Sequence, residues 1–454
     1  MKQFKMTPFN GVIALIAVTG ILAGFGCSPA DTNSEVVEAP ETEYRTLTLA
    51  EYEDKVAGGW LGQAIGVLFG APTEFMWAGE MIPFDFDDWY RRKPGAVDEA
   101  LARQHLLARE YVKMQEVRGK NKNDFETWEP YTPTQMPSQD DLYIEFLFLH
   151  SLRTHGLDVS AEQMAEDWLS YLEPTMIWGA NQSAYESFKQ GVLPPMSGQH
   201  PDNPGLGNAI DFQIESDLFG LLSPGLPQVS NALGDRAGHL MNHGDGVYGG
   251  MAMGAMYGEA FFESDPRTLV EHSMKAIPAE SRYHEMIRDV IAAYDANPDD
   301  WQAGWETIFA KWGEFLGLDV RTNGACVYLG LLYGEGDFWK TMNISMRCGV
   351  DSDCNPSSSA GIIATTLGMS GIPEQWAILR DLPISNSGIS GGPTLKEIYP
   401  DPIQWDDIIA ATVEVGHQNI LANGGKIEDG IIYIPRQMPV APPLEQVPVP
   451  EAAE

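Results

Sequence analysis

Hydrophobic positions along most of the chain recur every three or four residues, which is the period of an amphipathic helix. The stretch 141–152 is a clear case, with Leu142, Phe146 and Leu149 on one stripe. Alternation of Val or Ile with polar residues, which is typical of strands, is scarce. Residues 430–435 (GIIYIP) are the one clear strand candidate, and no repeat of fixed period is evident. The pattern therefore predicts an all-α fold.

Two further predicted helices, over 245–262 and 357–368, are unusually rich in Gly, Ala and Ser. Glycine inside a helix costs roughly 1 kcal/mol relative to alanine. We therefore expect both helices to be buried and to approach their neighbours closely. We interpret residues 45–436 as a single all-α domain, in which Pro- and Gly-rich loops near 118–137 and 190–206 border a cleft.

The first residues have the pattern of an export signal. Lys2 and Lys5 precede an apolar run over 12–24 that is too short to span a bilayer comfortably. Residues 22–27 (LAGFGC) resemble a bacterial lipoprotein box, in which Cys27 becomes the lipidated first residue. An ordinary signal peptide with soluble release is the alternative. We expect an exported bacterial protein, periplasmic or anchored to the outer membrane through lipid.

The ends of the chain differ in composition from its centre. Residues 1–27 form the predicted signal peptide, and residues 28–44 are polar, acidic and typical of a disordered tether. Residues 437–454 are rich in proline and predict an extended tail.

The charge of the chain is strongly negative. The sequence has 28 Lys and Arg against 64 Asp and Glu, a formal net charge of −36. Such a surface argues against nucleic acid as a partner and against a basic membrane-binding face, so we expect membrane contact only through a lipid anchor. Most of these carboxylates are adequately explained by adaptation to a salty exterior, where charge is screened.

Four cysteines occur, at positions 27, 326, 348 and 354. If Cys27 carries lipid, an odd number remains, so at least one is a free thiol or pairs between chains. Cys348 and Cys354 are candidates for a short-loop disulfide outside the cytoplasm. No CxxC motif or Cys/His cluster indicates a zinc site.

Three acidic features carry the candidate chemistry. Asp140 and Asp141 begin one predicted helix, Asp351 and Asp353 precede another, and Glu74 closes the segment GQAIGVLFGAPTE. An Asp before a helix is commonly an N-cap, which is the structural alternative. Their apolar and Gly-rich surroundings indicate burial, and several buried carboxylates need a cation if all are ionised. Oxygen ligands suit Mg²⁺, Mn²⁺ or Ca²⁺.

Four blocks, in order and with compatible spacing, resemble the ADP-ribosylglycohydrolase family, which also contains dinitrogenase-reductase-activating glycohydrolases and J1-type crystallins. The matching blocks are GQAIGVLFGAPTE (62–74), QDDLY (139–143), NHGDGVYGG (242–250) and GVDSDCNPSSSAG (349–361). The resemblance spans residues 55–376 and implies a compact orthogonal multi-helix bundle.

The resemblance also implies a metal site with two Mg²⁺ ions, or one, with Mn²⁺ as an alternative. Asp140, Asp141, Asp351 and Asp353 fall on the family's metal ligands. Glu74 falls on an acid that sits on a mobile loop over the site.

The resemblance further places His243 where the family has a substrate-contacting histidine, and we assign Gly244 and Tyr248 to the same region. A packing histidine is an equal alternative for His243. Aromatic side chains that could stack on a base or sugar are Trp178, Tyr185, Phe212, Phe219 and Tyr248. Most such residues are simply core.

The chain departs from the family pattern at three positions. Gln139 and Cys354 replace ligating threonines, and a thiol is a poor Mg²⁺ ligand, so one metal is lost, shifted or differently bound. Asn355 can compensate through its carbonyl oxygen or act as a helix cap. Val67 replaces an Asp near the site.

These features predict a metal-dependent hydrolase that cleaves a glycosidic bond to ADP-ribose or a related ribosyl or glycosyl group, free or linked to protein. Asp140, Asp141 or Glu74 would accept the proton of the attacking water. Two alternatives stay open: an α/α-barrel glycoside hydrolase or lyase, and a non-catalytic ligand-binding lipoprotein with the same fold. The exact substrate and the oligomeric state are not determined by the sequence.

Overall fold

We describe the protein from a computed structural model. The described residues are 43–85, 91–92, 129–130, 136, 139–172, 177–200, 202–315, 317–384, 398–399 and 402–446. The chain divides into residues 1–41 and residues 42–454, and every described residue belongs to the second part. The predicted signal peptide, the predicted lipidation site Cys27 and most of the predicted loop 118–137 lie outside the described residues.

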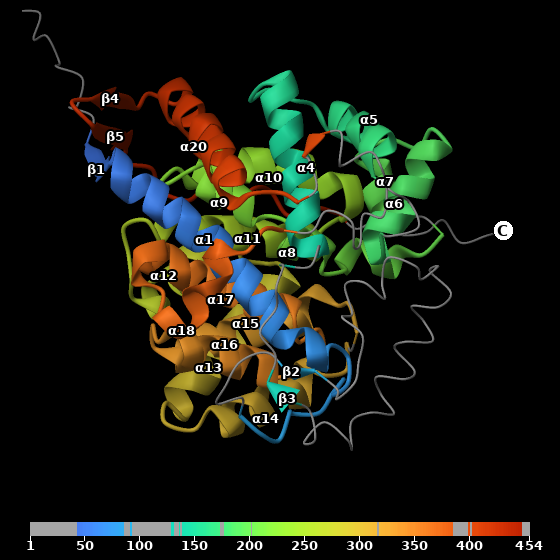
Figure 1. Cartoon of the computed structure of the whole chain (residues 1–454). Coiled ribbons are helices and arrows are strands. Elements are labelled where there is room, and N and C mark those ends of the chain that lie inside the picture. The colour runs from blue at the N-terminus through green and yellow to red at the C-terminus, as the bar shows by residue number, and fades with distance from the viewer. Residues whose placement is uncertain are drawn as a thin grey trace, which may run out of the picture. The chain divides into compact units, whose positions relative to one another are not determined.

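Helices form most of the described chain (Figure 1). The α-helices are α1 (Leu49–Gly70), α4 (Asp140–His155), α5 (Ala161–Tyr171), α6 (Gly179–Lys189), α7 (Met196–Gln199), α8 (Asp211–Ile214), α9 (Asp217–Leu221), α10 (Pro227–Met241), α11 (Asp245–Glu259), α12 (Pro266–Met274), α13 (Arg282–Ala296), α14 (Trp301–Trp312), α15 (Val320–Gly334), α16 (Phe338–Arg347), α17 (Cys354–Leu367), α18 (Glu374–Ala377) and α20 (Trp405–Ala422). Short 3₁₀ turns are η1 (Ala71–Thr73), η3 (Pro204–Asn208), η4 (Met369–Gly371) and η5 (Ile378–Asp381). The prediction of an all-α multi-helix bundle is confirmed.

Strands are few among the described residues. The strands are β1 (Tyr44–Thr48), β2 (Arg91–Arg92), β3 (Glu129–Pro130), β4 (Lys426–Glu428) and β5 (Ile431–Pro435). An antiparallel sheet has the order β1-β5-β4, with Leu47 opposite Ile432. The strand candidate at 430–435 is therefore confirmed, and its partner β1 joins it from the other end of the domain.

Helix α1 begins at a complete capping box. The Thr48 hydroxyl accepts a hydrogen bond from the Glu51 backbone N–H at 3.0 Å, and the Glu51 carboxylate accepts one from the Thr48 N–H at 2.8 Å. Both interactions satisfy backbone donors that the first helical turn leaves free. The start of α1 is thus fixed by local sequence.

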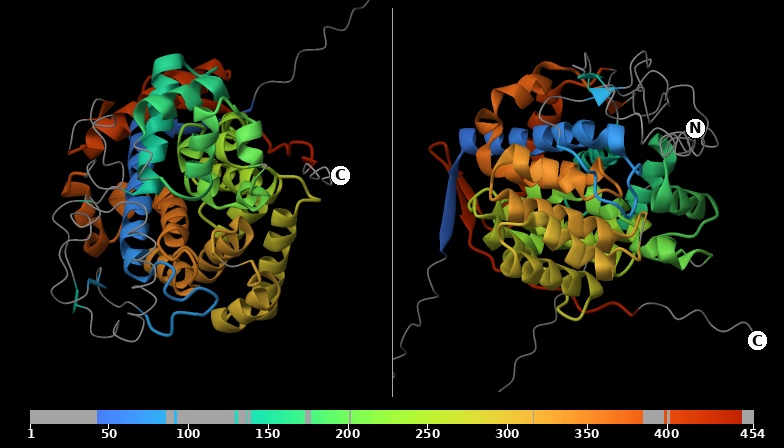
Figure 2. Two further views of the ribbon diagram at one scale, coloured as in Figure 1. Left: turned by 90° about the vertical axis from the view of Figure 1, so that its right-hand side faces the viewer. Right: turned by 90° about the horizontal axis from the view of Figure 1, so that it is seen from below.

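Helices α1 and α17 pack along almost their whole lengths, and the views in Figures 1 and 2 place them side by side. Glycines recur every four residues on the face of α1 that meets α17, at positions 58, 62, 66 and 70. A methyl group at any of them would overlap the backbone of α17 or of the loops at its two ends. Close packing without side chains therefore brings the end of α1 beside the start of α17.

The predicted helices over 141–152, 245–262 and 357–368 correspond to α4, α11 and α17. The two small-residue helices are buried along nearly their whole lengths, as expected. Helix α4 is buried more fully than an amphipathic stripe implies, because Asp141 and Glu145 are buried together with the apolar residues.

The three described cysteines, Cys326, Cys348 and Cys354, are buried and free. The suggested disulfide between Cys348 and Cys354 is therefore not formed in this structure. Cys354 instead donates a hydrogen bond from Sγ to Asp141 Oδ2 at 3.3 Å. Within the described part of the chain, no helix combines the length and hydrophobicity needed to span a bilayer.

Residues 437–446, which we call the C-terminal strap, contain no helix or strand. The strap contacts α10 through Asn231, whose side-chain amide donates to the Val440 carbonyl oxygen at 3.4 Å. Next to α11, the Glu445 backbone N–H donates to the Tyr248 hydroxyl at 2.6 Å. The part of the predicted tail that the structure describes is therefore bound to the helices.

Candidate active site

A cavity of about 410 Å³ lies at the N-terminal ends of α4 and α17. Its volume is in the range typical of small-molecule sites. The cavity is lined by Glu74, Phe75, Gln139, Asp140, Trp178, Gly179, Ile210, Asp211, Ile214, Leu318, Asp351, Asp353 and Cys354.

The acidic residues singled out in the sequence meet at this cavity, although they are separated by up to 279 positions along the chain. The residues of the predicted site that line it directly are Glu74, Gln139, Asp140, Asp351, Asp353 and Cys354. Asp141 lies immediately behind the wall, where it is fully buried and accepts the hydrogen bond from Cys354. The structure thus brings together every residue proposed as a metal ligand.

Glu74 is placed by the turn that follows α1. The Phe75 backbone N–H donates to the Val350 carbonyl oxygen at 2.9 Å, and the Thr73 and Ser352 hydroxyls are 2.8 Å apart. These bonds tie the Glu74 turn to the segment that carries Asp351. Phe75 and Val350 both adopt positive φ, at 53° and 63°. Non-glycine residues in this region are strained, and strain of this kind concentrates at functional sites.

Helix capping does not account for the aspartates. Asp353 occupies the N-cap position of α17, yet its side chain makes no capping hydrogen bond. The N-cap of α4 is Gln139, and Asp140 and Asp141 lie in the first turn. The positive ends of both helix dipoles therefore point toward carboxylates that are not needed as caps.

Burial is the main electrostatic feature of the site. It raises the pKa of Asp141 well above its usual value, and the nearby Asp140 and Asp353 raise that pKa further. Burial likewise raises the pKa of Asp353, with Glu74 and Asp351 adding to the shift. The pKa of Asp351 rises to about 7, again mainly through burial. Unless a cation is bound, these carboxyl groups therefore resist being ionised together.

The donor set fits a hard divalent cation. Asp141 Oδ1 and Asp353 Oδ1 are buried oxygens without a hydrogen-bond partner. An unsatisfied buried acceptor is costly, and a divalent ion satisfies acceptors of this kind. Ligand atoms of Asp351, Asp353 and Cys354 lie within 4.8 Å of one another. Cys354 fits least well, because burial raises the pKa of its thiol and keeps it protonated.

Two polar residues of the site were missed by sequence reasoning. Asp211, at the start of α8, lines the cavity, and burial raises its pKa to about 7. Asn323 Oδ1, on α15, accepts hydrogen bonds from the Asn355 side-chain amide at 3.0 Å and the Asp351 backbone N–H at 3.3 Å. Asn323 thus ties the segment that carries Asp351 and Asn355 to α15. Neither Asp211 nor Asn323 belongs to a recognisable motif, so only the fold reveals their positions.

Among the aromatic residues proposed to stack on a ligand, Trp178 lines the cavity. The other four are buried in the hydrophobic core: Tyr185, Phe212, Phe219 and Tyr248. The core interpretation therefore holds for most of them.

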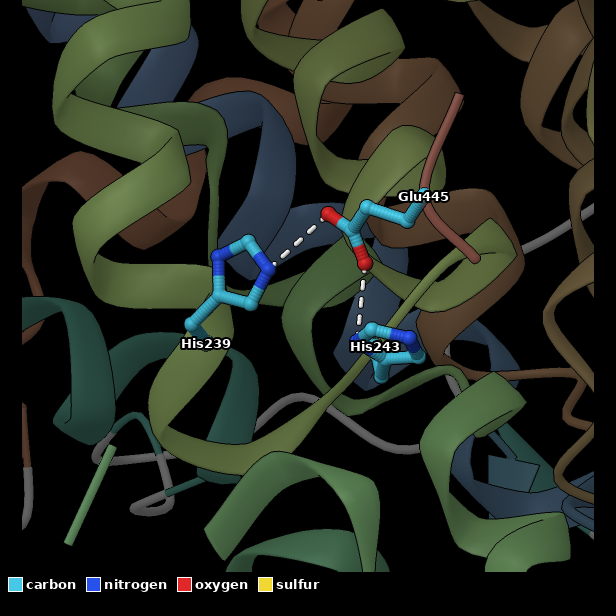
Figure 3. A group of neighbouring side chains, drawn as sticks. All are labelled: His239, His243 and Glu445. Carbon is cyan, nitrogen blue, oxygen red and sulfur yellow. Dashed lines mark hydrogen bonds and ion pairs between the residues drawn. The ribbon is translucent and has the colours of Figure 1, made fainter. Parts of the chain in front are cut away.

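His243, Gly244 and Tyr248 do not line this cavity. All three contact Glu445 of the C-terminal strap instead: His243 Nδ1 lies 2.8 Å from the carboxylate, and the Gly244 N–H donates to it at 2.9 Å. Figure 3 shows the Glu445 side chain between His243 and His239. The assignment of these three residues to substrate binding therefore stays a prediction.

Fold and site together define an all-α protein with buried carboxylates gathered at the N-termini of two helices. A family model for ADP-ribosylglycohydrolase matches residues 48–388, which is more than half of the chain. The chain therefore belongs to the ADP-ribosylglycohydrolase family, and this membership supports glycohydrolase activity.

A similar fold occurs in a solved structure described as an ADP-ribosylglycohydrolase-related protein complex. It has a TM-score of 0.50 and 15% sequence identity, and the match covers 82% of this chain and 99% of the other. At this identity the likeness concerns the fold alone. A comparison with curated proteins gave no match.

Proposed function

We propose that this protein is a metal-dependent glycohydrolase that releases ADP-ribose or a related ribosyl group from its substrate. The observation that carries the proposal is the pair of buried oxygens, Asp141 Oδ1 and Asp353 Oδ1, which have no hydrogen-bond partner beside a cavity of ligand size. Family membership supports glycohydrolase chemistry, and it disfavours the α/α-barrel alternative.

We assign the metal ligands to both helix N-termini. Asp140, Asp141, Asp351 and Asp353 would hold one or two Mg²⁺ or Mn²⁺ ions, and the Gln139 amide oxygen would supply a further ligand. Bound ions of this class polarise water and orient sugar hydroxyls. Cys354 would remain a thiol that donates its hydrogen bond to Asp141.

The cavity walls give the remaining residues distinct roles. Asp140 and Glu74 line the cavity, whereas Asp141 lies behind its wall, so Asp140 or Glu74 is better placed to accept a proton from an attacking water. Trp178 and Phe75 offer aromatic surface to a base or sugar. Asp211, with a pKa of about 7, can hold a proton and hydrogen-bond to a substrate hydroxyl.

We propose one reaction but several classes of substrate. The N-terminal pattern predicts export, and an exported enzyme would meet secreted ADP-ribosylated proteins, nucleosides or other ribosides rather than cytosolic targets. A non-catalytic binding protein with the same fold remains the second candidate, because Val67 and Cys354 replace residues that the family pattern carries.

The test compares hydrolysis of ADP-ribosylated peptides and ribosides by the wild-type protein and by Asp351→Asn, with chelator and with added Mg²⁺ or Mn²⁺. We expect the variant to lose at least about 100-fold in kcat/KM, since removing one preorganised stabilising group from an active site costs roughly 2.7–4 kcal/mol. Asp299→Asn is the matched control, because Asp299 is exposed. Unchanged turnover in Asp351→Asn would remove the metal mechanism, and binding without turnover in the wild-type protein would favour the binding protein.

A further inference from the structure

We propose that His239, His243 and Glu445 form a second metal site, which binds Zn²⁺ and fastens the C-terminal strap to the body of the protein. The proposal does not depend on the carboxylate site. One ligand atom from each of the three residues lies within 4.8 Å of the others (Figure 3). His239 Nε2 is 2.9 Å from Glu445 Oε1, and His243 Nδ1 is 2.8 Å from Oε2.

The hydrogen bonds of His239 fix which of its nitrogens is free to bind metal. Its Nδ1 lies 2.7 Å from the Asp235 backbone carbonyl oxygen. A carbonyl oxygen can only accept, so Nδ1 carries the proton. In the neutral ring, Nε2 is then a bare lone pair that faces the Glu445 carboxylate. The two atoms lie at hydrogen-bond distance, 2.9 Å, so either a second ring proton or a cation must lie between them.

The same conflict occurs at His243, with the two ring nitrogens exchanged. Its Nε2 lies 3.4 Å from the Gln446 carbonyl oxygen, which again accepts only. Its Nδ1 is buried and has no hydrogen-bond partner, although Glu445 Oε2 is 2.8 Å away, because the oxygen lies off the line of a hydrogen bond. In tetrahedral coordination a ring nitrogen points at the ion and not at the neighbouring ligand, so an off-line contact is expected.

The arrangement has the outer contacts that metal-binding histidines usually have. A ligating imidazole commonly donates its second N–H to a backbone carbonyl, as the rings of His239 and His243 do here. The Glu445 carboxylate is itself oriented by the Gly244 backbone N–H, at 2.9 Å. The strap is fixed at the same residue, since the Glu445 N–H donates to the Tyr248 hydroxyl.

Ligand type selects the ion. Two imidazoles and one carboxylate are a zinc ligand set, and the fourth position is left for water. The side chains of His239, His243 and Glu445 are 14%, 12% and 21% exposed, so the group is shielded yet reachable by solvent. Tetrahedral Zn²⁺ at about 2.0–2.2 Å from each ligand needs neighbouring ligand atoms roughly 3.3 Å apart. The two histidine–glutamate contacts involve different carboxylate oxygens. A shared ion would therefore need these contacts to open by a few tenths of an ångström, and the other ligand separations, at most 4.8 Å, to close toward the same value.

Sequence patterns of the usual kind do not show this site. The two histidines are four positions apart, but His243 lies just beyond the end of α10, and Glu445 is about 200 residues further along the chain. The site forms only when the strap lies against α10 and α11. Zn²⁺ would therefore stabilise the bound strap, because an ion that binds only the docked state shifts the equilibrium toward it.

The experiment titrates the full-length protein with Zn²⁺ by calorimetry in excess Mg²⁺, and records the visible spectrum with Co²⁺ in place of Zn²⁺. We expect one Zn²⁺ per chain, a tetrahedral Co²⁺ spectrum, and protection of the strap from protease by Zn²⁺. Glu445→Gln and His239→Ala should each weaken Zn²⁺ binding at least 100-fold, beyond the roughly 10–100-fold effect of outer contacts.

Two controls separate this site from the catalytic proposal. Asp351→Asn should bind Zn²⁺ normally, whatever its hydrolytic activity, and Glu428→Gln, at an exposed glutamate of β4, should match the wild-type protein. The proposal is overturned if the wild-type protein takes up no Zn²⁺ in excess Mg²⁺, or if Glu445→Gln binds it as tightly. Equal protease protection of the strap in chelator and in Zn²⁺ would also overturn it, because two protonated histidines would then suffice.

Discussion

The substitution Gly66→Ala tests whether close packing of α1 on α17 positions the site. A methyl group at this position would lie 2.5 Å from the Pro356 carbonyl carbon and 2.6 Å from the Ser357 nitrogen. Both atoms belong to the backbone of the first turn of α17, so neither can rotate away. Reaching an ordinary contact of about 3.5 Å requires the helices to separate by roughly 1 Å.

The expected loss of stability follows from two opposing effects. Overpacking costs about 1–3 kcal/mol, and the backbone contact places this case at the upper end. Replacing glycine by alanine inside a helix stabilises that helix by about 1 kcal/mol. We expect a net loss of about 2 kcal/mol in the free energy of unfolding. In a domain of this size that corresponds to a fall of about 3 °C in Tm.

The functional effect should exceed the effect on stability. A shift of about 1 Å would move Asp351 and Asp353 relative to Glu74, and a displacement of that size can reduce activity by about 100-fold. Calorimetry would measure Tm and the affinity for Mg²⁺, and a hydrolysis assay would measure kcat/KM. Gly234→Ala is the matched control, since its new methyl group meets Phe212 at an ordinary 3.4 Å. The reasoning fails if Gly66→Ala is as stable and as active as Gly234→Ala.

Two further predictions concern the carboxylate site. Cys354→Ser should tighten Mg²⁺ binding several-fold in calorimetry, because a hydroxyl is a better ligand than a thiol for a hard ion; weaker binding would show that the thiol contributes more than its replacement. The second prediction concerns pH. Burial raises the pKa of Asp351 from 3.8 to about 7, so its contribution to stability is complete below its unfolded pKa and is lost as pH rises through about 7. Tm in chelator should fall between about pH 4 and pH 7, and Mg²⁺ affinity should rise over the same interval; a flat Tm would contradict the raised pKa.

Much of the fold was predictable because it follows from local sequence. Periodicity located α4, and small-residue composition located α11 and α17. Helical spacing and close helix packing each require a recognisable pattern of residue types in the local sequence. Strand β1 was missed, because a strand of five residues at the edge of a sheet has little pattern of its own. It is held by β5, which lies nearly 400 positions away.

The sequence predicted the acidic residues that it carries in recognisable blocks, but not the polar residues that the fold places beside them. Asp140 begins α4, Asp353 immediately precedes α17, and both belong to recognisable blocks, so the sequence pointed to them. Asp211 and Asn323 reach the same region only because α8 and α15 pack against α17. Side chains that act through tertiary contacts carry no local signal.

The residues assigned to substrate illustrate the same limit. His243 and Tyr248 were placed by resemblance to one block of the family. Their contacts are with Glu445 of the C-terminal strap, which lies outside every matched block. The resemblance to that block therefore did not reveal that both side chains contact Glu445.

The central claim is that Asp141, Asp351 and Asp353 hold a divalent cation at the N-termini of α4 and α17. Crystals grown with Mn²⁺ test it most directly, through the anomalous scattering of the ion. We predict an anomalous peak within about 2.0–2.6 Å of Asp353 Oδ1, the bond range for hard divalent ions and oxygen. A map with no peak among these carboxylates at saturating Mn²⁺ would contradict the account.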